Sequence, residues 1–372
     1  MANKHWLGGT VDHETEMTTA ANWSPAAVPT TDDTIWFDGR AGDDSATGKK
    51  YDCIANGSAA VRLAGLNVMS DYDGDIALVT EPWEIHFSVT ADTTEQLNFA
   101  GSGTAYIMNS GEGAVALTFI PVVICNPPSG GSLHLISEFN TNLTTFNLFT
   151  KVIQISGTLY LWGTAAAGAL AVGQPGMSCC IAELFMCGGT CYSQEGVQLP
   201  PTAIAANYAG LGNNFANAVD NQATYILMKG GTLYWNSRLV DATGAGSLEH
   251  ILNIFGGTFN WGQDTYSGEA ALDAGLIRLF NGIFNWGTED AVKSIIGQIE
   301  VFSGGTLQIS QTHGVAGIKE LGLAGGTKSI VYTGGKIDLT SAYEQFAFED
   351  TDCVLISRGG TITVPPSEEL TW

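Results

Sequence analysis

GGTLYW at residues 230–235 is followed by GGTFNW at 256–261, NGIFNW at 281–286, GGTLQI at 304–309, GGKIDL at 334–339 and GGTITV at 359–364. Successive copies start 26, 25, 23, 30 and 25 residues apart. A repeat of this length is typical of solenoid proteins, in which each unit forms one coil and stacks on the next. The sequence therefore predicts a solenoid with coils of about 25 residues.

Each copy reads as a strand, a corner and a second strand. A short apolar run such as Ile251 to Phe255 precedes the glycines, and a Thr with alternating apolar and polar residues follows them. Alternation with a period of two is typical of β-strands, and glycine supplies the positive φ angles of a tight corner. The predicted fold is all-β, a right-handed parallel β-helix with an N-terminal cap and a long loop excursion.

Aligning the copies on their glycines predicts two columns of stacked core residues. The residue between the columns, Asn260 for example, is polar in most copies and is expected to face solvent. A stripe of Trp can also form a sugar-binding platform, but aliphatic residues in later copies of the same column favour a core role. The first column comprises Leu233, Phe259, Phe284, Leu307, Ile337 and Ile362, and the second Trp235, Trp261, Trp286, Ile309, Leu339 and Val364.

The chain divides into three regions. Residues 1–62 are expected to cap the first coil, and residues 63–364 to form the β-helix, with irregular coils to about residue 225, an excursion over 192–222 and regular coils over 225–364. Residues 365–372 form a tail. The candidate contacts with another subunit are Trp6, Trp23 and Trp36 in the cap and Trp372 in the tail, although Trp372 could equally plug its own last coil.

Charge and hydropathy exclude several classes of partner. The chain has 14 Lys and Arg against 37 Asp and Glu, a formal net charge of −23, so a phosphate backbone would be repelled and nucleic acid is excluded as a direct partner. No apolar run approaches the roughly 18 residues of a membrane-spanning helix, and the first residues lack the apolar region of a signal peptide. We expect no membrane partner and synthesis in the cytoplasm without export.

No cofactor is predicted. Seven cysteines is an odd number, which favours reduced thiols over a disulfide framework. Cys179, Cys180, Cys187 and Cys191 lack the paired C-x2-C spacing of structural zinc sites. Asp71, Asp73 and Asp75 alternate around a glycine and are candidate calcium ligands, but Pro82 stands where a calcium loop needs its twelfth-position Glu. A charged turn is the alternative reading.

The repeat resembles the passenger repeats of autotransporters and other right-handed β-helix proteins, over about 140 residues. The segment ANWSPAAVPTTDDTIWFDG at 21–39 is similar to the N-terminal region of β-helical surface and phage structural proteins. An autotransporter would also carry an export signal and a C-terminal membrane barrel, and neither is recognised in this chain. The resemblance therefore favours a particle assembled in the cytoplasm, as phage virions are.

Catalytic motifs are not found. Many β-helix proteins cleave polysaccharides with two carboxylates facing across a cleft. Here His313-Gly314 lacks the preceding Gly of the polygalacturonase pattern, Ile318-Lys319 lacks its Arg, and neither a G-x-S-x-G elbow nor a phosphate-binding loop occurs. The sequence predicts a protein that is not an enzyme.

The leading hypothesis is a structural protein of a phage virion, a capsid decoration or tail-associated part that forms a homotrimer and contacts other virion proteins. The first alternative is a receptor-binding or polysaccharide-cleaving spike, which predicts an open groove with two close carboxylates and exposed aromatic residues. The second is a self-assembling surface filament, which predicts uncapped, complementary ends.

Overall fold

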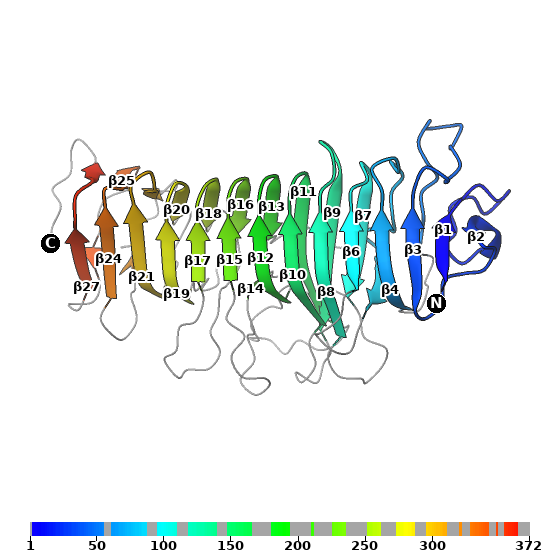
Figure 1. Ribbon diagram of the computed structural model, residues 1–372, viewed down its shortest axis with the longest axis horizontal. Helices are drawn as coiled ribbons and strands as arrows, with labels where there is room; N and C mark the ends of the chain where they lie inside the picture. Colours follow the sequence, from blue (N-terminus) through cyan, green and yellow to red (C-terminus); the bar gives the residue numbers. More distant parts are fainter. Residues whose placement is uncertain are drawn as a thin grey trace. The chain divides into compact units, whose positions relative to one another are not determined.

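A computed structural model confirms the predicted all-β parallel β-helix (Figure 1). Among the described residues, helix is limited to one 3-10 turn, η1 (Ala20–Asn22), and no helix there is long and apolar enough to cross a membrane. The structure describes residues 2–55, 61–87, 95–109, 118–139, 147–165, 180–193, 210–211, 225–235, 251–261, 273–286, 295–310, 320–321, 328–341, 347–348 and 353–363.

The chain forms two compact units, residues 1–181 with 196–207 and residues 182–195 with 208–372. In the first unit, strands on one side of the coil pair in parallel in the order β1, β3, β4, β6, β8 and β10, and on the other side in the order β4, β5, β7, β9 and β11. The bounds are β1 (Asn3–Trp6), β2 (Trp23–Ser24), β3 (Asp33–Phe37), β4 (Val61–Val68), β5 (Trp83–His86), β6 (Gln96–Phe99), β7 (Thr104–Asn109), β8 (Thr118–Cys125), β9 (Ser132–Phe139), β10 (Asn147–Gln154) and β11 (Thr158–Ala165).

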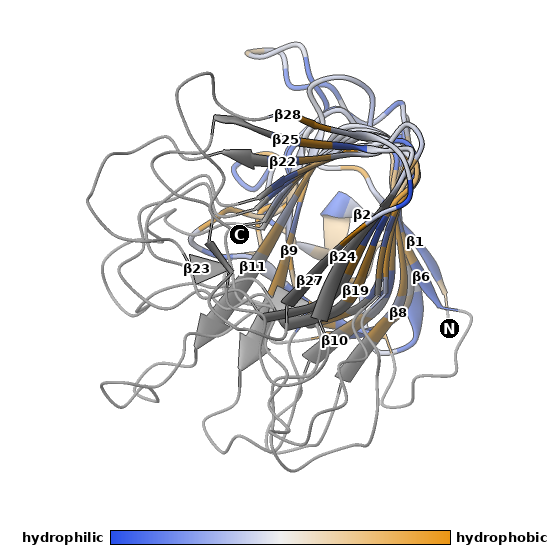
Figure 2. Cartoon of the chain, turned by 90° about the vertical axis from the view of Figure 1, so that its left-hand side faces the viewer, coloured by the Kyte–Doolittle hydropathy of each residue, from blue (hydrophilic) through white to orange (hydrophobic). Residues whose placement is uncertain are grey.

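The second unit contains the Gly-Gly repeats, and its coils alternate between two parallel sheets. We call the sheet of β12, β15, β17, β19, β21, β24 and β27 the first sheet, and the sheet of β13, β16, β18, β20, β22, β25 and β28 the second sheet. A view along the coils separates the two sheets (Figure 2). The bounds are β12 (Cys180–Met186), β13 (Thr190–Ser193), β14 (Gly210–Leu211), β15 (Tyr225–Met228), β16 (Thr232–Trp235), β17 (Ile251–Ile254), β18 (Thr258–Trp261), β19 (Asp273–Leu279), β20 (Ile283–Trp286), β21 (Ile295–Phe302), β22 (Thr306–Ser310), β23 (Glu320–Leu321), β24 (Lys328–Thr333), β25 (Lys336–Ser341), β26 (Ala347–Phe348), β27 (Cys353–Ser357) and β28 (Thr361–Thr363).

The strands stack in the register that the repeat predicts. Leu233 aligns with Phe259, Phe259 with Phe284, Phe284 with Leu307, Leu307 with Ile337 and Ile337 with Ile362. The first five of these side chains are buried and Ile362 is partly exposed. Phe259 and Phe284 stack with ring centroids 5.2 Å apart, close to the roughly 4.8 Å between neighbouring strands. One coil therefore packs directly on the next through the interior.

The corners differ in which glycine takes a positive φ. In the coils that turn at 189, 231 and 257 it is the second glycine of the pair, whereas at 304 and 334 it is the first, and at 359–360 both do so. In most of these corners, therefore, only one glycine of the pair has a positive φ. At Gly231 and Gly257 a side chain would also meet the backbone of the preceding corner, since an added Cβ would lie 2.6 and 2.4 Å from a carbonyl oxygen.

The outward column of the second sheet is less exposed than expected. Asn260 is buried, and its side-chain oxygen accepts a hydrogen bond from Asn285 Nδ2 at 2.6 Å. Amide side chains on adjacent coils lie in register and form a hydrogen bond from one coil to the next, as Asn98 also does to Asn67 in the first unit at 2.8 Å. The expectation that Asn260 faces solvent is therefore wrong.

Candidate functional site

Among the described residues of the second unit, three phenylalanines form an apolar stack. Phe255, Phe280 and Phe302 follow or end β17, β19 and β21, where the chain leaves the first sheet and turns towards the second. Their rings are parallel, with centroids 4.4 Å apart between Phe255 and Phe280 and 4.7 Å between Phe280 and Phe302. We call these three residues the phenylalanine ridge. Figure 1 shows the corners that follow the arrows of β17, β19 and β21 in succession along the second unit.

The ridge is exposed to solvent. Phe255 is 44% exposed, and Phe280 and Phe302 are partly buried. Ile283, which begins β20 after the corner that follows Phe280, adds a 38% exposed side chain. Because the ring planes are parallel and spaced like the coils, each ring covers the face of its neighbour and presents an edge outwards. Such a surface suits contact with another apolar surface better than stacking against a sugar ring, which needs an open aromatic face.

The residues in line with the ridge carry no negative charge in the described part of the second unit. Before Phe255 the corners contribute Cys187 and Lys229, and after Phe302 they contribute Thr333 and Arg358. Lys229 and Arg358 are exposed. In a chain of net charge −23, this column is a local exception to the acidic surface.

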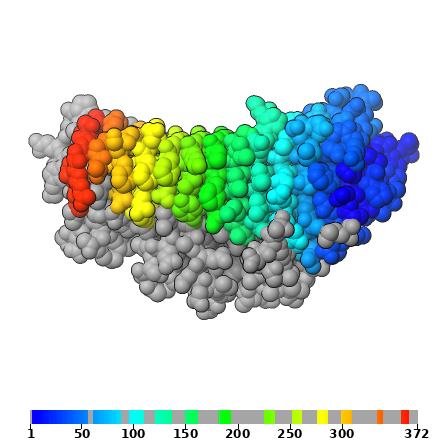
Figure 3. Space-filling view, in the orientation of Figure 1, coloured from blue at the N-terminus to red at the C-terminus, as the bar shows by residue number. Residues whose placement is uncertain are grey.

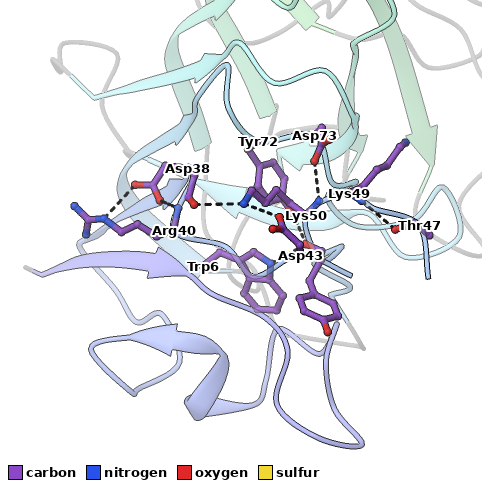
Figure 4. Close-up of polar contacts among 11 residues, drawn as sticks. Trp6, Asp38, Arg40, Asp43, Thr47, Lys49, Lys50, Tyr72 and Asp73 are labelled. Carbon is purple, nitrogen blue, oxygen red and sulfur yellow. Dashed lines mark hydrogen bonds and ion pairs between the residues drawn. The ribbon is translucent and has the colours of Figure 1, made fainter. Parts of the chain in front are cut away.

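In the first unit, polar contacts hold the cap region to the coils (Figure 4). The Lys50 ammonium lies 2.7 Å from Asp43 Oδ1 and 3.4 Å from the Gly39 carbonyl oxygen, and the Lys50 backbone N–H donates to Asp73 Oδ1 at 2.7 Å. The carbonyl of Tyr51 accepts from both the Trp6 indole at 3.0 Å and the Tyr72 hydroxyl at 2.8 Å. The side chains of Trp6, Tyr72 and Asp73 thus form hydrogen bonds with the backbone at Lys50 and Tyr51, and these contacts stabilise the fold.

The candidate calcium ligands also bond to backbone. Asp73 accepts from Lys50, and Asp75 Oδ1 accepts from the Thr104 backbone N–H at 2.6 Å. The Asp75 N–H in turn donates to Asp52 Oδ1 at 2.8 Å, and burial raises the pKa of the Asp52 carboxyl. Asp71 is exposed. Within the residues that the structure describes, no three His, Cys, Asp or Glu side chains are grouped so as to hold a metal ion.

Two of the tryptophans expected at an interface lie in the interior of the cap. Trp6 and Trp23 have 0% and 1% of their surface exposed and pack against each other edge to face at 5.1 Å, with Trp23 Nε1 donating to the Met17 carbonyl. Neither can reach a partner while the cap is folded, because aromatic burial forms the core of the cap. Trp36 is partly exposed and stacks on His5, at 6.0 Å. Trp372 and Val364 lie outside the described residues.

For the predicted second column of core residues, the structure describes the backbone pairing of the strands but not the side chains. Trp235, Trp261, Trp286 and Ile309 align on adjacent strands, and the register shifts by one residue between Gln308 and Ser310, where Ile309 and Leu339 would pair. The side chains of this column lie outside the described part of the chain. The choice between a core column and a sugar platform stays open there.

Three cysteines, Cys53, Cys125 and Cys191, are buried, and Cys187 is exposed at its corner. Burial raises the pKa of the Cys125 thiol to about 12, so this thiol stays protonated and unreactive at neutral pH.

His134 is stacked between Tyr106 and Tyr160, at 4.3 Å from each ring, and burial lowers the pKa of His134 to about 3. This imidazole is neutral at physiological pH and packs as an aromatic ring.

In the sequence, Phe255, Phe280 and Phe302 each end a short apolar run that precedes a corner, and hydropathy indicates no further role for them. The available signal was the recurrence of Phe just before the corner in three consecutive copies, although the residue there differs in the other copies.

Comparison with known proteins assigns neither a family nor a function: no family model, no curated protein and no solved structure matches this chain.

Proposed function

We propose that this chain is a non-enzymatic structural protein of a phage virion, a capsid decoration or tail-associated part that acts through contacts with copies of itself and with other virion proteins. The observation that carries the proposal is the solid interior. In the second unit, the inward residues of consecutive coils are buried without interruption, from Ile226 through Leu252 and Ile277 to Ile299. A body filled in this way is stiff and offers its outer surface, not an internal cleft, for function.

The placement of charged residues supports the same conclusion. In the first unit, Asp33, Asp52, Asp73 and Asp75 all accept hydrogen bonds from backbone N–H groups, which reinforces the turns between coils. Carboxylates used in this way are poorly placed to exchange protons with a substrate. The segment at residues 21–39, whose similarity to phage structural proteins motivates the virion, forms η1, β2 and β3 of the cap.

The test is whether the protein is a stoichiometric component of particles. Particles purified from cells that carry the gene would be analysed by quantitative mass spectrometry and labelled with gold-tagged antibodies raised against the recombinant chain. We expect a constant copy number per particle and label on the outer surface. Absence from purified particles overturns the virion role, and release of reducing ends from host polysaccharide by the recombinant chain overturns the non-enzymatic role.

A further inference from the structure

The geometry of the phenylalanine ridge points to a second copy of this chain as its partner. We propose that two copies meet ridge against ridge, in antiparallel orientation, with Phe280 of each copy on the two-fold axis. The inference rests on the proposed function in that it names one of the contacts through which a structural protein would act. The argument has three steps, from exposure, from charge and from periodicity.

The first step is that the ridge leaves apolar surface in water. Phe255 and Ile283 are two of the six exposed large apolar residues among the described part of the chain, and they belong to the corners of two successive coils. The rings of Phe255, Phe280 and Phe302 stack on one another, so only their outer edges remain to be covered. Covering them with an apolar surface is favourable in proportion to the area removed from water.

The second step is that an acidic chain is repelled by its own copy over most of its surface. With a net charge of −23, two copies approach most easily where no carboxylate lies at the contact. The corner column has only neutral residues between Lys229 and Arg358. These two cations at its ends lower the local repulsion further.

The third step is the period of the ridge. Its rings are spaced 4.4 and 4.7 Å apart, following the coils, and a surface with this repeat is matched rung for rung by another surface with the same repeat. With Phe280 opposite Phe280, Phe255 lies opposite Phe302 of the other copy. Lys229 then lies opposite Thr333 and Arg358 opposite Cys187, so no two cations meet. A two-fold contact of this kind is self-complementary and closes after two copies.

The experiment compares the recombinant full-length chain with Phe255→Ser by sedimentation equilibrium. We expect the unaltered chain to form a dimer. Phe255→Ser should raise the dissociation constant of this dimer at least about tenfold, the effect of losing one aromatic side chain from the contact. Leu78→Ser and Val11→Ser are the matched controls, since these side chains are 41% and 77% exposed and belong to the first unit, which does not contain the ridge. Both are expected to leave the dimer unchanged. Thermal unfolding of each variant verifies that it is folded.

A second measurement does not depend on loss of association. In a Cys187→Ser background, Asn281→Cys places a thiol on the exposed residue that follows Phe280, near the proposed two-fold axis. Mild oxidation is expected to link two copies through this thiol, whereas Val11→Cys in the same background gives no linked dimer.

The outcomes separate the two proposals. A monomeric unaltered chain, a trimer, or a dimer that Phe255→Ser leaves intact overturns the ridge contact, as does failure of Asn281→Cys to link copies. If the chain is nevertheless a component of purified particles, the virion role stands without the ridge. A ridge dimer in a protein absent from particles leaves the contact standing and overturns the virion role.

Discussion

Asp33 fixes the start of the chain to the first coils. Its side chain is 3% exposed, and its two oxygens accept hydrogen bonds from the backbone N–H of Ala2 at 2.8 Å and from the N–H and hydroxyl of Thr30, both at 3.1 Å. Burial alone would raise the pKa of this carboxyl, but the hydrogen bonds from Thr30 and Ala2 outweigh burial and lower it. The ionised form is thus favoured in the folded cap.

Replacing Asp33 with Asn is expected to destabilise the cap by about 1–3 kcal/mol, because an amide cannot accept at both positions and leaves a backbone donor unsatisfied. Since the folded-state pKa is below the unfolded value, the carboxylate stabilises the fold fully above the unfolded pKa, and this stabilisation is lost as the pH falls through the folded pKa. Thermal unfolding at several pH values should show that Asp33→Asn flattens the acid side of the stability profile. An unchanged acid side would contradict this role of Asp33.

Gly257 illustrates a residue that is required for two reasons. Its φ is +84°, and an added Cβ would lie 2.4 Å from the carbonyl oxygen of Gly231 in the preceding corner. Gly359 is the matched control, since its φ is +90° but an added Cβ would meet nothing within 4 Å. Gly257→Ala should therefore cost more than the roughly 1–2 kcal/mol of conformational strain expected for Gly359→Ala. Equal losses in urea unfolding would show that the approach of successive corners is not tight.

At the scale of elements, one carbonyl links the cap strand β1 to the first coils. The Tyr51 oxygen accepts from Trp6 in β1 and from Tyr72 in the turn after β4. Removing either donor leaves the oxygen with the other, whereas removing both leaves a partly buried carbonyl without a hydrogen bond from either side chain. Tyr72→Phe should cost about 1 kcal/mol, and its combination with Trp6→Phe more than the sum of the two single changes. A double-mutant cycle by chemical unfolding measures the difference, and strict additivity would rule out the shared acceptor.

The elements that the sequence predicts best are those governed by repetition. Alternation around the glycines aligned Leu233, Phe259, Phe284 and Leu307 as the register has them, because each coil must bury the same side of its strand against its neighbours. The burial of Asn260 and the exposure of Phe255 were not predictable from hydropathy. The orientation of a residue at a strand end depends on the corner geometry, and the corners themselves differ in which glycine has positive φ. A candidate contact surface made of corner residues therefore required the structure.

At the scale of the molecule, net charge governs how copies approach one another. Two bodies of charge −23 repel over distances comparable with the Debye length, about 10 Å at 0.1 M salt. In Figure 3 the described coils of the second unit follow one another along one face, coloured from green to red. Apolar contact along the ridge is little affected by moderate salt, whereas the repulsion between the remaining surfaces is screened.

Association through the ridge is therefore expected to strengthen as salt is added. Sedimentation equilibrium between about 0.05 and 0.5 M NaCl should show the dissociation constant falling several-fold, because the Debye length shortens over this range. Phe255→Ser is the control and should dimerise at least about tenfold more weakly than the unaltered chain at each salt concentration, since screening alone supplies no attraction. If salt instead weakens the dimer, attraction between opposite charges holds the copies together, with Lys229 and Arg358 facing carboxylates, and the ridge-to-ridge arrangement is wrong.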